Sequence, residues 1–348
     1  MDMDIYIYTL PLRRAAVGIK SQPSSPERKY KHGLDILRRL PTSPPFTERD
    51  LGEQTGKVFI ITGAASGVGF ELARILYSKH GSVYIAARSS ARADEAIAKL
   101  RLALPGSQGR LMPLVIDIAD LGTMKAAVQQ FLRQESRLDV LVHNAGVMEP
   151  PVGSTTKLGH DLEIGTHCLG PFVLTTLLQD VLKRTAATMP AHPYTVRVLW
   201  IASLLSMGAP PGVMVFDDAG GPKAIRKVFP NYMQSKVGSA WLASEFAARF
   251  EQDGIMSVAV HPGLMRTELQ KTMPLPGRVI MSLLFKPAVY GAYTELYAAF
   301  SPGLTVDEIR GGYVIAWGRI EPVPKNIADV QKAAIFWRYC ERETSAYV

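Results

Sequence analysis

Cysteine is scarce in this chain, with two residues, Cys168 and Cys340, among 348. Two distant cysteines build no disulfide framework and lack the close spacings of metal-binding proteins. The seven histidines form neither an H-x-x-x-H pair nor a cluster with carboxylates. We therefore expect no metal site, and the cysteine usage suits a reducing compartment such as the cytoplasm.

Long apolar runs are missing as well. Segment 5–12 is apolar but too short to span a bilayer, and Pro11 interrupts it. The basic residues of the N-terminal region come after this apolar segment, whereas those of a signal peptide precede its apolar core. We therefore expect no transmembrane segment. Residues 1–50 are predicted to form a poorly ordered extension, and a peripheral membrane or targeting segment is the alternative.

The formal net charge of +8 would suit a nucleic-acid partner. However, Lys and Arg are scattered along the chain, and no basic stripe is interleaved with aromatic residues. We therefore predict no nucleic-acid partner, and an anionic cofactor would account for part of the excess positive charge.

The most informative stretch is Lys57–Gly69, which reads KVFIITGAASGVG. Its apolar run Val58–Ile61 is typical of a strand buried on both faces of a parallel sheet. A glycine-rich turn and an amphipathic helix follow. Such a turn lets the backbone approach a pyrophosphate, which the helix N-terminus binds through free N–H groups and its dipole. A glycine-rich turn without a ligand is the alternative.

From Leu51 onward, strand and helix patterns alternate. This order predicts an α/β fold, a Rossmann-type doubly wound parallel sheet with helices on both faces, in one domain over 51–348. Ligands of such sheets bind at the carboxyl ends of the strands. The predicted strands are 57–62, 83–87, 111–116, 139–143, 196–202, 256–261 and 312–317, and the predicted helices are 67–80, 90–104, 120–136, 158–186, 232–252 and 286–300.

The pattern Thr62-Gly63-x-x-x-Gly67-x-Gly69 resembles the cofactor turn of short-chain dehydrogenases/reductases. Further matching motifs extend the resemblance over about residues 50–320. It is nearest to the branch with retinol-dehydrogenase-like and WW-domain-oxidoreductase-like proteins, and to pathway reductases of fungal secondary metabolism. The resemblance implies an oxidoreductase with a nicotinamide cofactor.

The strand ends predict how that cofactor binds. Arg88 follows the second strand, and an arginine there accommodates the 2′-phosphate of NADP, so we predict NADP(H). A solvated surface arginine is the alternative. Asp117 ends the third strand, where the family's matching Asp accepts a hydrogen bond from adenine. His143-Asn144-Ala145-Gly146 resembles the family's N-N-A-G, in which Asn144 ties neighbouring strands.

The chemistry is predicted to lie after the fifth strand. Ser203 can hydrogen-bond a substrate carbonyl oxygen, and Ser206 is its nearby competitor. Tyr232 and Lys236 are four residues apart, so they share a helix face. An ammonium one turn away favours the phenolate, which lowers the pKa of the tyrosine. The resemblance implies that Tyr232 passes the proton, Ser203 holds the oxygen and Lys236 binds the nicotinamide ribose.

The sixth strand leads to a stretch that resembles the family's P-G-x-x-x-T, which holds the nicotinamide carboxamide and nearby phosphate. Segments 204–231 and 268–290 are predicted to be substrate loops, and their apolar residues suggest a small hydrophobic substrate. The predicted cofactor-binding residues are Gly63, Ser66, Gly67, Val68, Gly69, Arg88, Asp117, Ile118, Asn144, Ala145, Gly146, Tyr232, Lys236, Pro262, Gly263, Met265 and Thr267.

One residue departs from the family. Where the family has a catalytic asparagine, this chain has His167. We expect it to hold a water in the proton relay and to add a titration near pH 6.5, and packing in the core is the alternative. The sequence predicts an NADP(H)-dependent ketone, aldehyde or alcohol oxidoreductase and leaves a homodimer open. A non-redox isomerase or cyclase, or a cofactor-binding scaffold, is the rival function.

Overall fold

A computed structural model describes residues 43–189, 192–203, 206, 209, 213–266, 285–309, 312–323, 325 and 327–348. The described strands form an eight-stranded sheet in the order β3-β2-β1-β4-β5-β6-β7-β8. All neighbours from β3 to β7 are parallel, and β8 runs antiparallel to β7. The strands are β1 (Val58–Thr62), β2 (Ser82–Ala87), β3 (Arg110–Val115), β4 (Val140–His143), β5 (Val196–Ile201), β6 (Ile255–Val260), β7 (Gly312–Ile315) and β8 (Arg319–Pro322).

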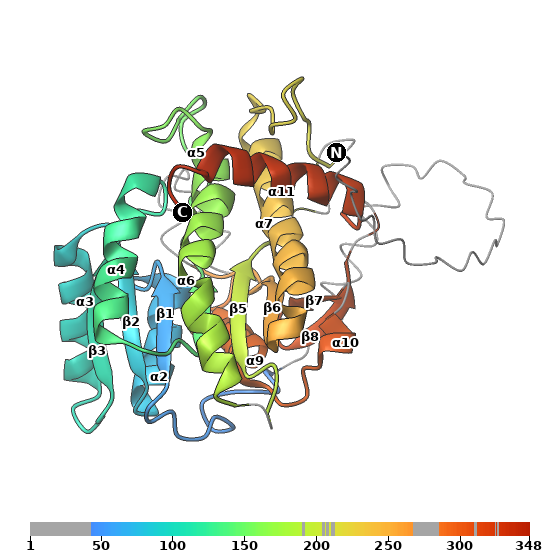
Figure 1. The fold of residues 1–348 in the computed structure, drawn as a ribbon. Coiled ribbons are helices and arrows are strands. Elements are labelled where there is room, and N and C mark those ends of the chain that lie inside the picture. Colours follow the sequence, from blue (N-terminus) through green and yellow to red (C-terminus); the bar gives the residue numbers. More distant parts are fainter. Residues whose placement is uncertain are drawn as a thin grey trace, which may run out of the picture.

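Helices cover both faces of this sheet, as Figure 1 shows. On one face lie α4 (Met124–Gln134), α6 (Gly170–Ala187), α7 (Val228–Phe250) and α11 (Val330–Thr344). On the other face lie α2 (Gly67–Ser78), α3 (Ser90–Ala103) and α9 (Ala288–Phe300). The short helices are α5 (Leu162–Ile164) and α10 (Val306–Ile309), and a π-helical turn, η2 (Gly165–Leu169), joins α5 to α6.

Strand alternation supplies an apolar cluster to each face. In β1, Val58 and Ile60 belong to the cluster under α4, α6, α7 and α11, whereas Phe59 and Ile61 belong to the cluster under α2, α3 and α9. Because successive side chains of a strand point to opposite faces, a strand buried on both faces is apolar at every position. The predicted doubly wound parallel sheet with helices on both faces is therefore confirmed.

The ends of several elements differ from the sequence-based expectation. The predicted strands are found with their ends within about two residues, but β8 was not predicted, and neither was α11. Helix α7 begins at Val228 rather than at residue 232, because Pro230 is tolerated in the first turn, where its missing N–H has no helical partner. The predicted helix 158–186 begins at Leu162 and contains the π-helical turn.

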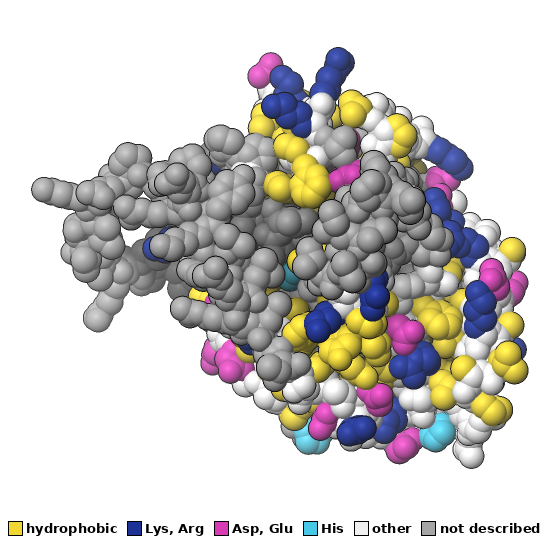
Figure 2. Space-filling model, turned by 180° about the vertical axis from the view of Figure 1, so that it is seen from behind, with side chains coloured by type: hydrophobic (Ala, Val, Ile, Leu, Met, Phe, Trp, Pro, Cys, Tyr) yellow, Lys and Arg dark blue, Asp and Glu magenta, His cyan; other side chains and the backbone are white. Residues whose placement is uncertain are grey.

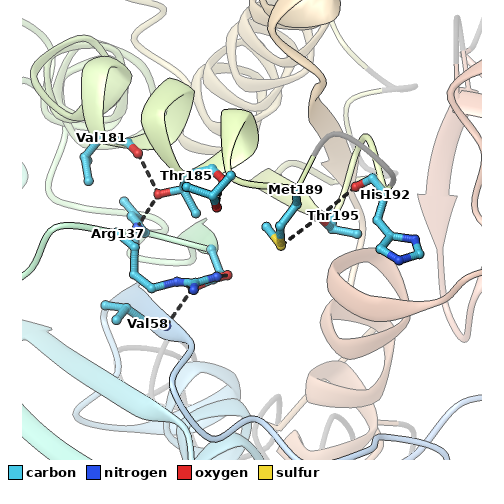
Figure 3. Close-up of polar contacts among 10 residues, drawn as sticks. Val58, Arg137, Val181, Thr185, Met189, His192 and Thr195 are labelled. Atoms are coloured by element: carbon cyan, nitrogen blue, oxygen red, sulfur yellow. Dashed lines mark hydrogen bonds and ion pairs between the residues drawn. The ribbon is translucent and has the colours of Figure 1, made fainter.

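Polar contacts hold the amino ends of β1 and β4, at the edge opposite the expected site (Figure 3). The Val58 N–H donates to Asp139 Oδ2 over 2.8 Å, and Arg137 Nε donates to the same oxygen over 2.9 Å. Thr185 Oγ1 accepts the Leu138 N–H over 2.9 Å and donates to the Val181 carbonyl. These contacts satisfy buried polar groups and fix α6 against the sheet.

Several predicted segments lie outside the described residues, namely 5–12, most of 268–290, Thr267 and part of 204–231. Within the described part of the chain, no helix is long and apolar enough to cross a bilayer. Phe46 packs edge-on against Tyr297 at 6.4 Å between ring centres, so the segment 43–50, expected to be poorly ordered, contacts α9. On the face in Figure 2, basic, acidic and hydrophobic side chains are interspersed over the described surface.

Candidate active site

A cavity of about 630 Å³ runs along the carboxyl ends of the strands. It collects side chains and turns from the ends of β1 to β6 and from α7, as expected for a parallel sheet of this order. Ser203 and His167 line it, together with most of the predicted cofactor residues. Those are Gly63, Ser66, Gly67, Val68, Arg88, Asp117, Ile118, Asn144, Ala145, Gly146, Tyr232, Lys236, Pro262, Gly263 and Met265.

The glycine-rich turn presents the N-terminus of α2 to this cavity. Gly67 and Val68, the first residues of α2, line it directly. Gly69 does not line it: a Cβ added there would lie 2.5 Å from Asn144 Nδ2, so the glycine permits close packing of α2 on the end of β4. Asn144 Nδ2 donates to the Thr62 carbonyl over 2.9 Å, which ties β1 to β4 as predicted.

Two arginines line the cavity beyond β2. Arg88 follows the strand, and Arg92 lies in the first turn of α3. Of these two, only Arg88 was predicted from the sequence to bind the cofactor. The signal for Arg92 was its place in the first turn of the predicted helix 90–104, which lies next to the carboxyl end of the preceding strand. The pair places two guanidinium groups at this end of the cavity.

The structure brings the predicted catalytic residues together. Ser203, just beyond β5, hydrogen-bonds the phenol of Tyr232 on α7. Lys236 Nζ donates to the Ile201 carbonyl over 2.8 Å and lies 5.8 Å from the centre of the Tyr232 ring. All three side chains are buried yet line the cavity, so they can meet a ligand there.

The proton affinities of this group differ from the prediction. Burial raises the pKa of Tyr232 to about 12; the hydrogen bond from Ser203 lowers that pKa, and the Glu163 carboxylate raises it. Burial also lowers the pKa of Lys236 to about 8. The expected lowering of the phenol's pKa by Lys236 is therefore wrong for this structure: desolvation of the phenolate is the largest cause of the shift, and Ser203, not Lys236, is the group that lowers this pKa.

His167 lies in the π-helical turn and has both ring nitrogens occupied. Its Nε2 accepts the Val147 N–H over 3.0 Å, and its Nδ1 lies 2.8 Å from Ser235 Oγ. Ser235 Oγ donates its own hydrogen to the Tyr232 carbonyl. The imidazole Nδ1–H is therefore the donor to Ser235, which fixes a neutral tautomer.

These contacts correct two expectations for His167. No ring nitrogen is left to hold a relay water. Burial is the main cause that holds the pKa of the imidazole well below its ordinary value of 6.5, and the charge of Lys236 lowers it further. A titration near pH 6.5 is therefore not expected. The structure favours the alternative in which the residue is packed, but it packs against catalytic elements rather than in a remote core.

The described residues contain no group of three or more His, Cys, Asp or Glu side chains that could hold a metal ion. His143, which replaces the first Asn of the family motif, hydrogen-bonds Thr175 Oγ1 over 2.7 Å. Burial lowers its pKa to about 3, so it stays neutral and packs against Trp200.

A doubly wound sheet with a glycine turn, basic residues beyond β2 and a Tyr–Lys pair at one cavity defines a dinucleotide-binding protein of the Rossmann type. A family model described as short chain dehydrogenase matches residues 57–188. The "Short-chain dehydrogenase/reductase pkfC" of Emericella nidulans is 38% identical over 310 residues, covering 88% of this chain and 98% of the relative.

A "Short-chain dehydrogenase/reductase" of Phomopsis amygdali is also 38% identical, over 322 residues that cover 89% of this chain and 96% of the relative. The crystal structure of an NADPH-bound carbonyl reductase from chicken fatty liver shares the fold, with a TM-score of 0.57, 19% identity, and coverage of 78% of this chain and 100% of that one. The chain belongs to the short-chain dehydrogenase/reductase family, whose members are oxidoreductases that use NAD or NADP.

Proposed function

We propose that this protein is an NADP(H)-dependent oxidoreductase that interconverts a ketone or aldehyde and the corresponding alcohol on a small hydrophobic substrate. The observation that carries the proposal is the convergence of Ser203, Tyr232 and Lys236 on the cavity that also contains the glycine-rich turn. The resemblance to fungal pathway reductases supports a secondary-metabolite intermediate as the substrate.

The basic end of the cavity supports NADP(H) over NAD(H). Arg88 and Arg92 line it just beyond β2, and the lining residues of that segment include no carboxylate. A guanidinium can bind a phosphate through two parallel charge-assisted hydrogen bonds. NAD-binding sites instead present an acidic residue to the ribose 2′-OH.

When bound, the nicotinamide exchanges a hydride with the reacting carbon. Tyr232 can donate its phenolic proton to the carbonyl oxygen during reduction and take a proton from the alcohol in the reverse direction. Ser203 can donate a hydrogen bond to the same oxygen and hold it beside the phenol. Lys236 would hold the nicotinamide ribose through its ammonium group, which lies 5.8 Å from the centre of the Tyr232 ring.

The remaining lining supports a hydrophobic substrate. Apolar side chains from the loop after β4, from α5, from the start of α7 and from the segment after β6 face the cavity that contains Tyr232. They are Val147, Met148, Leu162, Phe229, Leu264 and Phe285. The free thiols of Cys168 and Cys340 support a reducing compartment, and we place the protein in the cytoplasm.

Replacing Tyr232 by Phe tests the proposal. We expect turnover to fall by about a hundredfold or more, the scale of lost acid–base assistance, while NADPH binding is kept. Lys236→Ala should weaken turnover and NADPH binding together. Tyr84→Phe is the matched control, because it also removes a phenol hydroxyl. Tyr84 lies on β2 away from the cavity, and its hydroxyl hydrogen-bonds Gln134 and Glu135.

The assay follows NADPH oxidation with a panel of apolar ketones and aldehydes, and product analysis accompanies it. A Tyr232→Phe enzyme with most of its activity would overturn the mechanism. A non-redox isomerase or cyclase would instead convert its substrate without consuming NADPH.

A further inference from the structure

Glu163 is a buried carboxylate of α5 that the mechanism above does not use. Its side chain is 1% exposed, and it does not line the cavity. Oε2 accepts a hydrogen bond from Asn231 Nδ2 over 2.7 Å, and Oε1 accepts the backbone N–H of Glu149 over 3.3 Å. One carboxylate therefore joins α5, the first turns of α7 and the loop that follows β4.

His167, one helical turn after Glu163, contacts the same helix α7 and the same loop. His167 bonds Ser235 of α7 and accepts the Val147 N–H of the same loop. Residues four apart share a helix face, so Glu163 and His167 face Asn231 and Ser235 as two parallel pairs. We call these two pairs, Glu163–Asn231 and His167–Ser235, the double clasp.

The double clasp fixes the part of α7 that carries the catalytic side chains. Tyr232 follows Asn231 directly, and Lys236 follows Ser235. Asn231 is held on both ends of its amide: Oδ1 accepts the Ile225 N–H over 3.0 Å, and Nδ2 also donates to Asp161 Oδ2 over 3.0 Å. Positioning of this kind matters, because small displacements of a proton donor cost large factors in rate.

The carboxylate also acts through its charge. Burial raises the pKa of Glu163 to about 7, with the nearby charge of Asp161 acting in the same direction, while the bonds from Asn231 and the Glu149 N–H, and the charge of Lys236, lower it. The same carboxylate raises the pKa of Tyr232 and of Lys236. His167, the other titratable group of the clasp, is neutral and fixes the adjacent turn.

We propose that Glu163 is a positioning residue for Tyr232 and Lys236, which acts through its bond to Asn231 and through the negative charge of its side chain. This inference rests on the proposed oxidoreductase function, because it concerns the proton donor of that reaction. It adds a third element, α5, to the machinery formed by β5 and α7.

The first test is Glu163→Gln, assayed for carbonyl reduction with NADPH. An amide has one acceptor oxygen, so it keeps one of the two bonds that the carboxylate accepts. We expect kcat to fall about tenfold with NADPH affinity unchanged. Loss of the charge lowers the pKa of Tyr232 and Lys236, so the alkaline limb of the rate profile should move about one pH unit lower.

The second variant is Asn231→Ala, which breaks the bond and keeps the carboxylate. It should lower kcat to a similar extent. Combining it with Glu163→Gln should lower kcat little further, because both variants disturb the same Glu163–Asn231 hydrogen bond. Glu295→Gln is the matched control: Glu295 is equally buried, but it lies in α9 on the opposite face of the sheet and should leave the alkaline limb in place.

Unfolding provides a readout that needs no turnover. The folded-state pKa of Glu163 is raised above 4.5, so its stabilising protonated form is lost as pH rises toward 7. The stability of the wild type should therefore fall relative to Glu163→Gln between pH 5 and 7. An active wild type whose alkaline limb and kcat survive Glu163→Gln would overturn this inference. An inactive wild type would overturn the proposed function instead, so the two failures are distinguishable.

Discussion

Arg88 is the single residue that we expect to decide the cofactor preference. Arg88→Ala should weaken NADPH binding by about 1.5–3 kcal/mol, the range for a hydrogen bond to a charged group, and leave NADH binding nearly unchanged. Titration of cofactor fluorescence measures both. Lys99→Ala serves as the control, because Lys99 is an exposed cation of α3 that pairs with Glu95 over 2.6 Å. Equal losses for both cofactors would show that Arg88 has a structural role.

His167 gives a prediction about pH. Because burial and Lys236 hold the pKa of its imidazole far below 6.5, the rate profile should show no inflection from His167 between pH 5 and 8. His167→Asn should leave the profile's shape unchanged in that range. Its kcat should stay within about tenfold, since a shorter amide keeps one of two bonds. An inflection near pH 6.5 that disappears in the variant would restore the relay hypothesis.

Each predicted catalytic residue could be found from the sequence, but the residues that hold them in position could not. Ser203, Tyr232 and Lys236 belong to short motifs in a fixed order along the chain. Glu163 and Asn231 are 68 residues apart, and neither belongs to a motif with its partner. Only the packing of α5 on α7 brings them within hydrogen-bond distance, and no local pattern of residues encodes that approach.

Among the elements, α11 carries the clearest stability prediction. Phe336 is fully buried between α11 and α7, where its ring contacts Trp241. Phe336→Ala should cost about 3–5 kcal/mol of the free energy of unfolding, because it removes a large side chain and leaves a cavity. Val330→Ala is the control on the same helix: Val330 is 78% exposed, so the change should stay within about 0.5 kcal/mol. Denaturant unfolding at one pH measures both, and similar losses would contradict this packing.

How closely each strand or helix could be predicted from the sequence depended on its composition and its place in the fold. Most of the parallel strands are mainly apolar and buried, such as β1 and β4, so their positions were predicted closely. Strand β8 is the four-residue stretch RIEP, which is polar, contains a proline and pairs only at the sheet edge. Helix α11 did have a signal in the sequence, because apolar residues such as Phe336 and Cys340 are one turn apart and Asp329 can cap the helix, but it was not predicted.

For the whole molecule, stability should depend on pH through buried carboxylates. Glu295 is fully buried, and neither of its oxygens has a hydrogen-bond partner. Burial raises its pKa to about 8 from an ordinary value of 4.5, so the protonated form is the one that the fold stabilises. Its contribution is complete below pH 4.5 and is lost as pH rises through about 8.

Glu295→Gln removes this dependence. Between pH 5 and 8, the free energy of unfolding of the wild type should fall relative to the variant by about 1 kcal/mol per pH unit. Guanidinium unfolding of both proteins at several pH values measures the difference. Curves that stay parallel over this range would mean that the carboxylate finds a partner or water when it ionises.

The sheet also separates two apolar clusters that share no side chains. Leu72 of α2 belongs to one cluster and Phe131 of α4 to the other. Free-energy changes at sites without common partners add, so mutations on the two faces should combine independently. Stabilising mutations can therefore accumulate on the face of α2, α3 and α9, in natural or laboratory evolution. The stability they add can offset destabilising substitutions on the α7 face that change the choice of substrate.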